Sequence, residues 1–414
     1  MYNAKGRHIC KGLKRWICKK GGQNNIMLSV KEAKEILFKN FNIFKKGRVA
    51  LKDSLNYILS KDIIAPDYLP RFSNSAMDGY AIKFKNLKYK IVGKINSGDP
   101  FYSINLKEGE AIEISTGAPI PKGADTVVPI EDLEVKDGFI FIKKEVKKGE
   151  NIRKKGEDVK KGKIILKKGE TLNPQKIGLL AALGIKEVEV FLKPEVGVIT
   201  TGSEVVEIDK EPKDFQIRNS NSYIIYSFLK KLGIEPKFIK HFPDEKGKIL
   251  KFLKSLKKHL DFLILTGGVS VGGKDYVKEE LENFGIRRLF WKVAQKPGKP
   301  IYAGIKGKTF YFGIPGNPGA AIICLYIYVY PLICKFMQKK DYELKKIDAI
   351  LISDVKSKSL RSSFINCIYS KGKVKVLKEQ GSHRLLSFSK SNCFLELKPK
   401  GKLKKGQKVK VYLF

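Results

Sequence analysis

The spacing of apolar residues changes character along the chain, and each change marks a predicted domain. From Ser29 to about Phe44 apolar residues recur at helical spacing, and Ser29 with Glu32 three residues later forms a capping box. Residues 51–146 instead hold short runs of β-branched and aromatic residues between frequent Gly and Pro, as at 88–91, 111–114 and 139–142. This stretch predicts a β-rich domain.

A glycine-studded segment with a predicted helix at 174–183 follows the β-rich stretch. We expect the N-terminal helix and this segment to form one small α+β domain, discontinuous in sequence (27–50 and 147–184), into which the β-rich domain 51–146 is inserted. Residues 1–26 are basic and lack the apolar core of a signal peptide, so they form an extension to which we assign no function.

Residues 185–337 alternate between apolar strands and amphipathic helices. The predicted strands are 196–200, 237–241, 262–265 and 310–314, and the predicted helices are 220–232, 244–257, 275–284 and 318–334. Such alternation indicates an α/β domain in which a parallel-rich sheet is covered on both faces. Ligands of such sheets bind beyond the carboxyl ends of the strands.

Residues 338–414 return to short alternating segments, at 349–352, 373–376, 394–397 and 408–412. They predict a small C-terminal β-barrel or sandwich. The fold class is therefore multidomain α/β plus β.

Composition narrows the classes of function. The net charge is +40, from 82 Lys and Arg against 42 Asp and Glu, but the lysines are scattered along the chain rather than massed in one block. We interpret this charge as solvated surface, do not expect nucleic acid as a partner, and regard small anionic ligands as compatible with it.

Two further features bear on location. The apolar run Ala320–Cys334 is shorter than the roughly 20 residues of a membrane span, so we interpret it as a buried helix and expect no membrane association. The six cysteines form no CxxC pair, and the four histidines lack metal-ligand spacing. These features fit a reducing cytoplasm and argue against histidine-based metal chemistry.

Three loops of the α/β domain hold candidate ligand-binding groups. Thr201 and Gly202 follow the first strand, and Gly267, Gly268, Ser270 and Gly272 follow the third. Paired glycines allow close approach to phosphate, although a tight turn explains them equally well. The last strand ends in Pro315, Gly316, Asn317 and Pro318, where exposed N–H groups at a helix start favour an anion.

Charged residues complete the candidate site. Lys292 and the turn formed by Lys296, Pro297, Gly298, Lys299 and Pro300 present ammonium groups suited to phosphates and oxyanions, although lysines this close could also be chance in so lysine-rich a chain. Glu204, Asp244 and Asp275 follow strands, so they are expected at one rim of the sheet, where carboxylates facing phosphate would share Mg²⁺. Asp244 and Asp275 could instead be ordinary acids at helix N-termini.

The complete series of motifs resembles the molybdopterin molybdotransferase family, which comprises bacterial MoeA and the gephyrin E domain. The matching segments occur in the family's order from about Met27 to Phe414: 74–81, 115–121, 153–158, 201–204, 266–272, 296–300 and 315–318. Departures are Ser73, where the family often has an acid, and Gly319-Ala320, where an apolar–serine pair is common.

The resemblance implies a central MogA-like three-layer α/β domain and a homodimer with its active site in a cleft between the subunits. It implies adenylyl-molybdopterin and molybdate as substrates, Mg²⁺ as cofactor, and release of AMP. The implied metal and adenylate-side ligands are Glu204, Asp244 and Asp275, with Lys292 and Lys296 as the anion clamp. The implied contributions of other domains are Asp78, Thr116, Arg153, Asp158 and Ser387.

Competing functions remain open at this stage. Adenylylation of molybdopterin uses a related α/β domain, a scaffold role occurs among E-domain relatives, and a nucleic-acid binder would rest on charge alone. The β-rich domain, the C-terminal barrel and the full set of acids and lysines favour the transferase. A molybdopterin adenylyltransferase and other cofactor-biosynthesis proteins are expected partners, and the sequence does not separate molybdate from tungstate.

Overall fold

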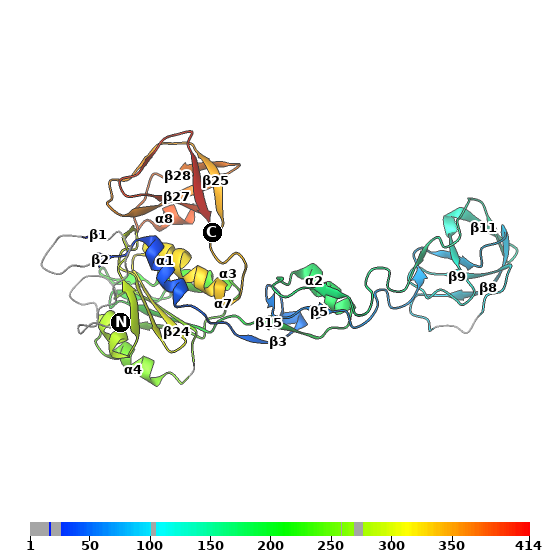
Figure 1. Ribbon diagram of the computed structural model, residues 1–414, viewed down its shortest axis with the longest axis horizontal. Helices are drawn as coiled ribbons and strands as arrows, with labels where there is room; N and C mark the ends of the chain where they lie inside the picture. The colour runs from blue at the N-terminus through cyan, green and yellow to red at the C-terminus, as the bar shows by residue number, and fades with distance from the viewer. Residues whose placement is uncertain (1–15, 18–25, 101–104, 258, 269–275) are drawn as a thin grey trace, which may run out of the picture. The chain divides into compact units, whose positions relative to one another are not determined.

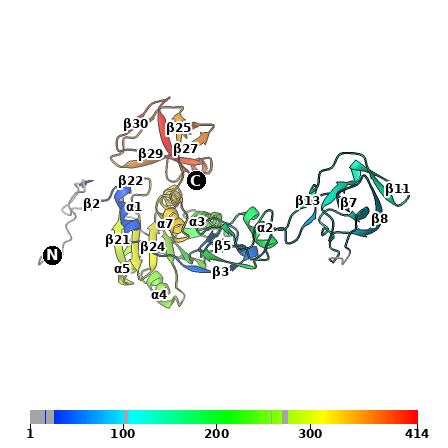
Figure 2. The same cartoon turned by 45° about the vertical axis from the view of Figure 1, so that its right-hand side comes forward.

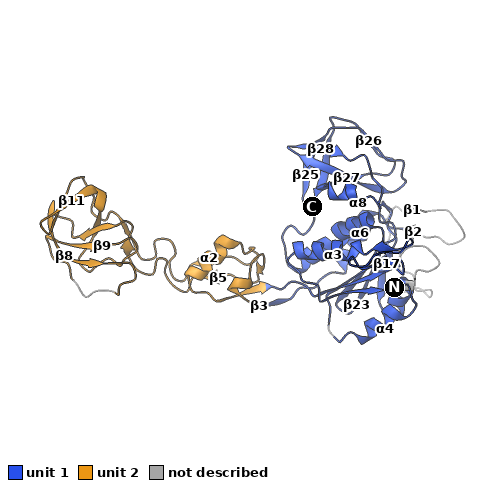
Figure 3. Ribbon diagram, turned by 180° about the vertical axis from the view of Figure 1, so that it is seen from behind, with its two compact units in different colours: residues 1–47, 191–414 blue, residues 48–190 orange. Residues whose placement is uncertain are grey.

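The protein is described by a computed structural model, which covers residues 16–17, 26–100, 105–257, 259–268 and 276–414. The chain divides into two compact units (Figure 3). Unit 1 comprises residues 1–47 and 191–414, and unit 2 comprises residues 48–190. In the predicted extension, β1 (Trp16–Ile17) pairs antiparallel with β2 (Ile26–Met27).

The centre of unit 1 is a six-stranded sheet. Its strand order is β19 (Phe238–Phe242), β16 (Val196–Thr201), β20 (Phe262–Thr266), β24 (Thr309–Ile314), β23 (Tyr302–Lys306) and β21 (Arg287–Trp291). The first four strands run parallel, and β23 and β21 extend the sheet by antiparallel pairing. The prediction of a parallel-rich sheet is confirmed, with an antiparallel edge added to it.

Helices cover both faces of this sheet (Figures 1 and 2). One face packs against α1 (Val30–Lys39), α3 (Ser220–Lys231), α6 (Pro318–Cys324) and α7 (Tyr330–Phe336). The other face packs against α4 (Lys248–Ser255) and α5 (Tyr276–Asn283). Because side chains alternate along a strand, Val198 and Ile264 enter the first core while Ile199 and Leu265 enter the second. The domain is therefore a three-layer α/β sandwich.

Helix α1 belongs to this core. Its capping box of Ser29 and Glu32 is present, and Val30, Ala33 and Leu37 are buried. These side chains pack in the same hydrophobic cluster as the sheet residues of unit 1. Helical periodicity shows that a helix has an apolar face but does not identify the surface that covers it.

The long apolar helix is a core helix of unit 1. A π-helical turn, Leu325–Val329, joins α6 to α7. By length and composition the span Pro318–Phe336 could cross a membrane, with a mean hydropathy of 1.7, but 78% of its most apolar window is buried inside the structure. This burial agrees with the interpretation made from the sequence.

The C-terminal region of unit 1 is a closed five-stranded β-barrel, as predicted. Its strands are β25 (Lys346–Leu351), β27 (Ser362–Ser370), β28 (Lys373–Val376), β29 (Cys393–Leu397) and β31 (Lys408–Leu413). Pairing of β27 with β29 closes the barrel. Smaller elements are β26 (Val355–Lys356), β30 (Lys402–Leu403) and α8 (Leu385–Ser389). A two-residue strand from the α/β domain, β22 (Gln295–Lys296), pairs in parallel with the start of β27.

Unit 2 contains the predicted β-rich domain. Its six-stranded sheet has the order β10 (Thr126–Pro129), β7 (Gly79–Ile82), β9 (Glu110–Ile114), β8 (Lys88–Ile95), β12 (Phe139–Ile142) and β11 (Leu133–Lys136). The remainder contains α2 (Pro174–Ala182) and the short strands β4 (Ile58–Leu59), β5 (Ile63–Ile64), β6 (Asn74–Ser75), β13 (Ile152–Arg153) and β14 (Ile164–Leu166). Strand β15 (Glu187–Phe191) lies between β3 (Lys46–Ala50) and β4.

Candidate functional site

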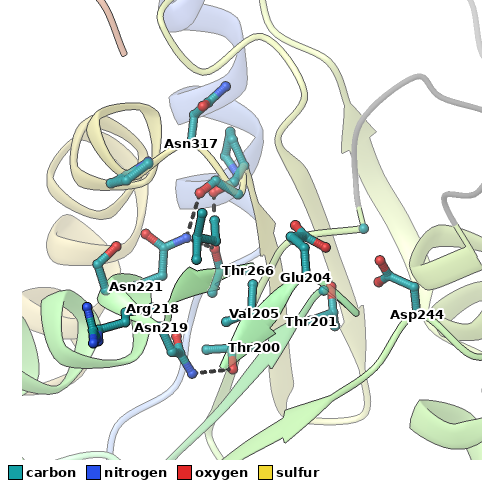
Figure 4. A pocket seen from close by; sticks show the side chains of 18 of the residues that line it. Thr200, Thr201, Glu204, Val205, Arg218, Asn219, Asn221, Asp244, Thr266 and Asn317 are labelled. Carbon is teal, nitrogen blue, oxygen red and sulfur yellow. Dashed lines mark hydrogen bonds between the residues drawn. The ribbon is translucent and has the colours of Figure 1, made fainter. Parts of the chain in front are cut away.

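A cavity of about 450 Å³ lies beyond the carboxyl ends of β16, β20 and β24. This is the place that a parallel sheet offers to a ligand. Many of the residues singled out in the sequence line it: Thr201, Gly202, Glu204, Asp244, Gly267, Gly268, Pro315, Gly316, Asn317 and Pro318. Figure 4 shows Glu204 and Asp244 on one side of the cavity, and Arg218 and Asn221 on the other.

The paired glycines after β20 are required by close packing. Gly267 and Gly268 both have positive φ, 91° and 60°. A Cβ on Gly267 would lie 2.5 Å from the carbonyl oxygen of Thr201, and one on Gly268 would lie 2.4 Å from Cγ2 of Val277. The loop therefore passes against β16 with no room for a side chain, which leaves its backbone beside the cavity.

Asn221, which the sequence interpretation missed, ties two of the cavity loops together. Its Nδ2 donates to Oγ1 of Thr266 (3.0 Å) and to the carbonyl oxygen of Gly316 (2.7 Å). Its Oδ1 is buried and accepts no hydrogen bond from the described residues, as is the case for Oγ1 of Thr201. Both residues line the cavity, and these two oxygens are buried polar atoms beside it. In the sequence, an Asn at a helix start indicates only a cap.

A second polar chain lies under the cavity. Asn219 caps α3, accepting from the N–H of Ser222, and its Nδ2 donates to Oγ1 of Thr200 (3.1 Å) and to Glu207 (3.2 Å). His241 Nδ1 lies 2.9 Å from the same Thr200 hydroxyl. Asn219 and Thr200 are buried, so this network fixes the start of α3 against β16.

Two of the three predicted metal-binding carboxylates come together at this cavity. The loop of Asp244 is held by two reciprocal bonds to Ser203, from the Asp244 N–H to Oγ (2.9 Å) and from the Ser203 N–H to Oδ2 (3.4 Å). The carboxylate of Glu204 lies over Gly202, where an added Cβ would be 3.1 Å from both of its oxygens. Asp275, the third, lies outside the described residues, as do Ser270 and Gly272.

Among the residues that the structure describes, no cluster of three or more His, Cys, Asp and Glu side chains could enclose a metal ion. Mg²⁺ needs no such enclosure, because it commonly takes one or two carboxylates and completes its shell with water and substrate phosphate. Glu204 and Asp244, lining one cavity beside the glycine loop, fit that mode of binding.

A second, basic cavity of about 730 Å³ adjoins the first within unit 1. Lys296, Pro297, Gly298 and Lys299 line it, and the facing wall comes from the barrel. Pro300, Pro315 and Asn317 line both cavities. The sequence interpretation missed the cations of the barrel wall, which are Lys356, Lys358 and Arg361. The two cavities thus share a wall of loop residues. The first cavity is rich in oxygen acceptors, and the second is rich in cations.

Two predicted residues of unit 1 line neither cavity. Ser387 is buried and donates its hydroxyl to the carbonyl of Glu379 (2.5 Å), whereas Ser382 lines the basic cavity. Lys292 lies over the ring of Trp291 with its Nζ 3.7 Å from the centroid. Burial, with the nearby charges of Lys299 and Lys278, lowers the pKa of Lys292.

The remaining predicted residues lie in unit 2. Oδ1 of Asp78 accepts from the N–H (2.6 Å) and the hydroxyl (3.0 Å) of Thr116, and these bonds lower the pKa of Asp78. Arg153 lies on β13, paired with Asn74 of β6, and its side chain is exposed. Asp158 is also exposed. Asp78 and Thr116 are therefore a preorganised pair that comes from the two motifs of the β-rich domain.

Known protein families match nearly the whole chain. The family model of the MoeA N-terminal region (domain I and II) matches residues 28–184, that of a probable molybdopterin binding domain matches 197–335, and that of the MoeA C-terminal region (domain IV) matches 348–414.

Individual relatives agree with these matches. A molybdopterin molybdenumtransferase of Haemophilus influenzae is 37% identical over 376 residues, which are 88% of this chain and 93% of that protein. One from Staphylococcus epidermidis is 36% identical over 79% of this chain and 80% of its own length. Two crystal structures of molybdopterin biosynthesis MoeA protein from Pyrococcus horikoshii align with TM-scores of 0.77 and 0.73, at 28% and 30% identity. Each covers 94% of this chain, and the alignments span 99% and 100% of the solved chains.

Proposed function

This chain belongs to the MoeA family of molybdenum cofactor biosynthesis proteins, and we propose that it transfers molybdate to adenylyl-molybdopterin with release of AMP. The observation that carries the proposal is the pair of adjoining cavities with a common wall. The reaction brings two anionic reactants together, and electrostatic preorganisation is the main means of lowering its barrier.

The cavity beyond the sheet suits the adenylylated pterin. Its volume of about 450 Å³ is in the range of small-molecule sites, roughly 300–1,000 Å³. Thr201 and Asn221 contribute polar side chains to its lining, and the close-packed Gly267 and Gly268 leave backbone accessible to its phosphates.

The basic cavity suits molybdate. Its lining, around a volume of about 730 Å³, combines Lys296 and Lys299 with Lys356, Lys358 and Arg361 of the C-terminal region. Arg binds oxyanions through a planar fork of donors, whereas Lys acts as a point charge. Since Asn317 and Pro315 line both cavities, an oxyanion bound here would lie next to a ligand of the first cavity.

Mg²⁺ is part of this proposal, with Glu204 and Asp244 as its protein ligands. When bound, the ion would neutralise charge on the phosphoryl group that is being cleaved. The protein residues orient the phosphate through the glycine loop and hold the carboxylate of Asp244 in place through Ser203.

We further propose that the protein acts as a cytoplasmic homodimer in which Asp78, Thr116, Arg153 and Asp158 complete the site of a partner subunit. The four described cysteines are unpaired, as a reducing compartment would leave them. Complementation tests the shared site. Asp244→Ala and Asp78→Ala chains, each inactive alone, regain activity on mixing if one site draws on both subunits, because a mixed dimer then holds one intact site. Mixed dimers that stay inactive contradict the arrangement.

The first experiment is AMP release from adenylyl-molybdopterin, with molybdate or tungstate added, in Mg²⁺ and after chelation. We expect release that needs both the oxyanion and Mg²⁺, and the two oxyanions compared side by side give the metal preference. Lys296→Ala should lower the rate at least about tenfold, since losing one preorganised donor typically costs about 10²–10³. Lys251→Ala, an exposed lysine of α4, is the matched control. Tight pterin binding without oxyanion-dependent AMP release would reject the transferase in favour of a carrier or scaffold.

A further inference from the structure

The loop of residues 295–300, which lines the basic cavity from Lys296 on, is fixed by buried side chains of the long apolar helix, residues 318–336. Gln295 is completely buried, although the next residue, Lys296, is exposed and lines the basic cavity. Side chains of a strand alternate in direction, so β22 directs Gln295 inward and Lys296 outward. The pairing of β22 with β27 of the barrel fixes this register.

The amide of Gln295 is fully engaged. Its Nε2 donates to the carbonyl oxygen of Pro297 (3.1 Å) and lies 3.8 Å from Sγ of Cys324. Its Oε1 accepts from the hydroxyl of Tyr328. Burial raises the pKa of Tyr328 well above its ordinary value, so the hydroxyl remains a donor at neutral pH. A donor at Oε1 sets the orientation of the amide and thereby directs Nε2 to the loop.

Helix residues reach the loop at a second point. Cys324 donates from Sγ to the carbonyl of Gly298 (3.9 Å), and Cys324 is completely buried. Gly298 has φ +88°, and a Cβ there would lie 2.6 Å from Nε2 of Gln295 and 2.8 Å from Sγ of Cys324. The loop backbone thus rests directly on these two side chains.

The π-helical turn Leu325–Val329 contains Tyr328 and follows Cys324. The N–H of Tyr330 donates to the carbonyl of Leu325, five residues earlier, which widens the helix at this turn. Turns of this kind occur often at functional sites. Here the widened turn carries the Tyr328 hydroxyl that bonds to Gln295.

We propose that Tyr328 and Gln295 are positioning residues that set the place of Lys296 and Lys299, and hence the affinity of the basic cavity for its oxyanion. Neither residue lines a cavity described above, so they act through the loop backbone. The inference rests on the proposed function in one respect, since it takes molybdate as the anion of that cavity.

Isothermal calorimetry with sodium molybdate tests this. The protein is saturated with adenylyl-molybdopterin and kept free of Mg²⁺ by chelation, so that molybdate binds without release of AMP. The variants are Tyr328→Phe, which removes only the hydroxyl, Gln295→Met, which keeps the volume, and the double variant. Tyr326→Phe is the matched control, because Tyr326 lies in the same π-helical turn but packs on the rings of Phe394 and Phe414.

We expect molybdate affinity to fall about tenfold in both single variants, since the loss of one buried hydrogen bond is worth up to about tenfold in an equilibrium constant. The double variant should lose no more than the worse single variant, because the two groups act as one unit. Affinity for adenylyl-molybdopterin should change less than about twofold, and Tyr326→Phe should match the wild type. A merely structural role would not separate the two ligands in this way.

A failure of the proposed function and a failure of this inference give different results. Wild-type protein that binds adenylyl-molybdopterin but no molybdate would overturn the oxyanion half of the proposed function and this inference with it. Wild-type binding with equal molybdate affinity in Tyr328→Phe would overturn this inference alone. An equal loss for both ligands, or a loss in Tyr326→Phe, would also overturn it. Should Gln295→Met fail to fold, Tyr328→Phe decides.

Discussion

Glu280 should be a principal stabiliser of the segment that carries Asp244. Its carboxylate is 3% exposed and accepts from two N–H groups at the start of α4, those of Gly247 (2.5 Å) and Leu250 (2.8 Å). Helix α4 has no side-chain cap of its own, because Gly247 occupies the N-cap position. A residue of α5 therefore supplies the cap from a distance.

The magnitude follows from these two bonds. A hydrogen bond to a charged group contributes about 1.5–3 kcal/mol, and a carboxylate at a helix N-terminus adds about 0.3–1 kcal/mol. The desolvation of the carboxylate offsets part of this sum, which leaves about 3 kcal/mol for Glu280→Ala. At about 2–4 °C per kcal/mol for domains of 150–250 residues, the unfolding temperature should fall by about 6–12 °C. Glu280→Gln keeps one oxygen acceptor and should lose about half as much.

Scanning calorimetry measures the shift, and hydrogen exchange localises it. The amides of Gly247 and Leu250 should lose protection in Glu280→Ala before those of β20 do. Glu279→Ala is the control, because Glu279 is 64% exposed and its contact with Lys246 spans 3.9 Å, a pair worth under about 1 kcal/mol. Equal unfolding temperatures for the two alanine variants would refute the reasoning.

Three other variants address the site. Thr116→Val removes one of the two bonds that lower the pKa of Asp78, so NMR titration should show that pKa rising partway to its ordinary value. The stability that depends on ionised Asp78 is present above the unfolded pKa and is lost as pH falls through the lower folded pKa. Because the folded pKa of the variant lies closer to the unfolded pKa, the loss should be smaller and complete at a higher pH. Asn221→Asp puts a carboxylate oxygen against the carbonyl of Gly316, now 2.7 Å from Nδ2, and calorimetry should show adenylyl-molybdopterin binding weakened at least about tenfold. Gly298→Ala, at φ +88°, should lower both the unfolding temperature and molybdate affinity, with a strain cost of about 1–3 kcal/mol.

The α/β core was predictable because its strands are buried on both faces and read as continuous apolar runs. Strands β16, β20 and β24 lie within a residue or two of their expected bounds. Helix α4 begins at Lys248 instead of Asp244, since its cap comes from Glu280 and no local signal marks its start.

Elements that depend on tertiary contacts were not predictable. Strand β27 escaped the pattern because Ser363 and Asn366 are buried polar residues inside it. The antiparallel strands β21 and β23 were also missed, because their apolar runs are short and interrupted.

The candidate site was likewise predictable only in part. Residues directly after parallel strands, such as Glu204 and Gly267, must meet at one rim, so their shared cavity followed from topology. Arg361 joins Lys296 only because β22 pairs with β27, and no local spacing reports that pairing. Asn221 and Gln295 could not be identified as site residues from the sequence, because each is a single polar residue in an otherwise ordinary position.

The membership of α1 in the core of unit 1 has a consequence during synthesis. Unit 2 leaves the ribosome complete once residue 190 has emerged, but Val30, Ala33 and Leu37 must wait for strands as late as β24. At about 5–20 residues per second, the apolar face of α1 remains uncovered for on the order of 10–60 s. Helix α1, the first helix among the described residues, is thus among the last elements to be packed. Chaperone demand should accordingly concentrate on this N-terminal segment, not on the longer apolar helix that follows β24 and can pack as soon as it is made.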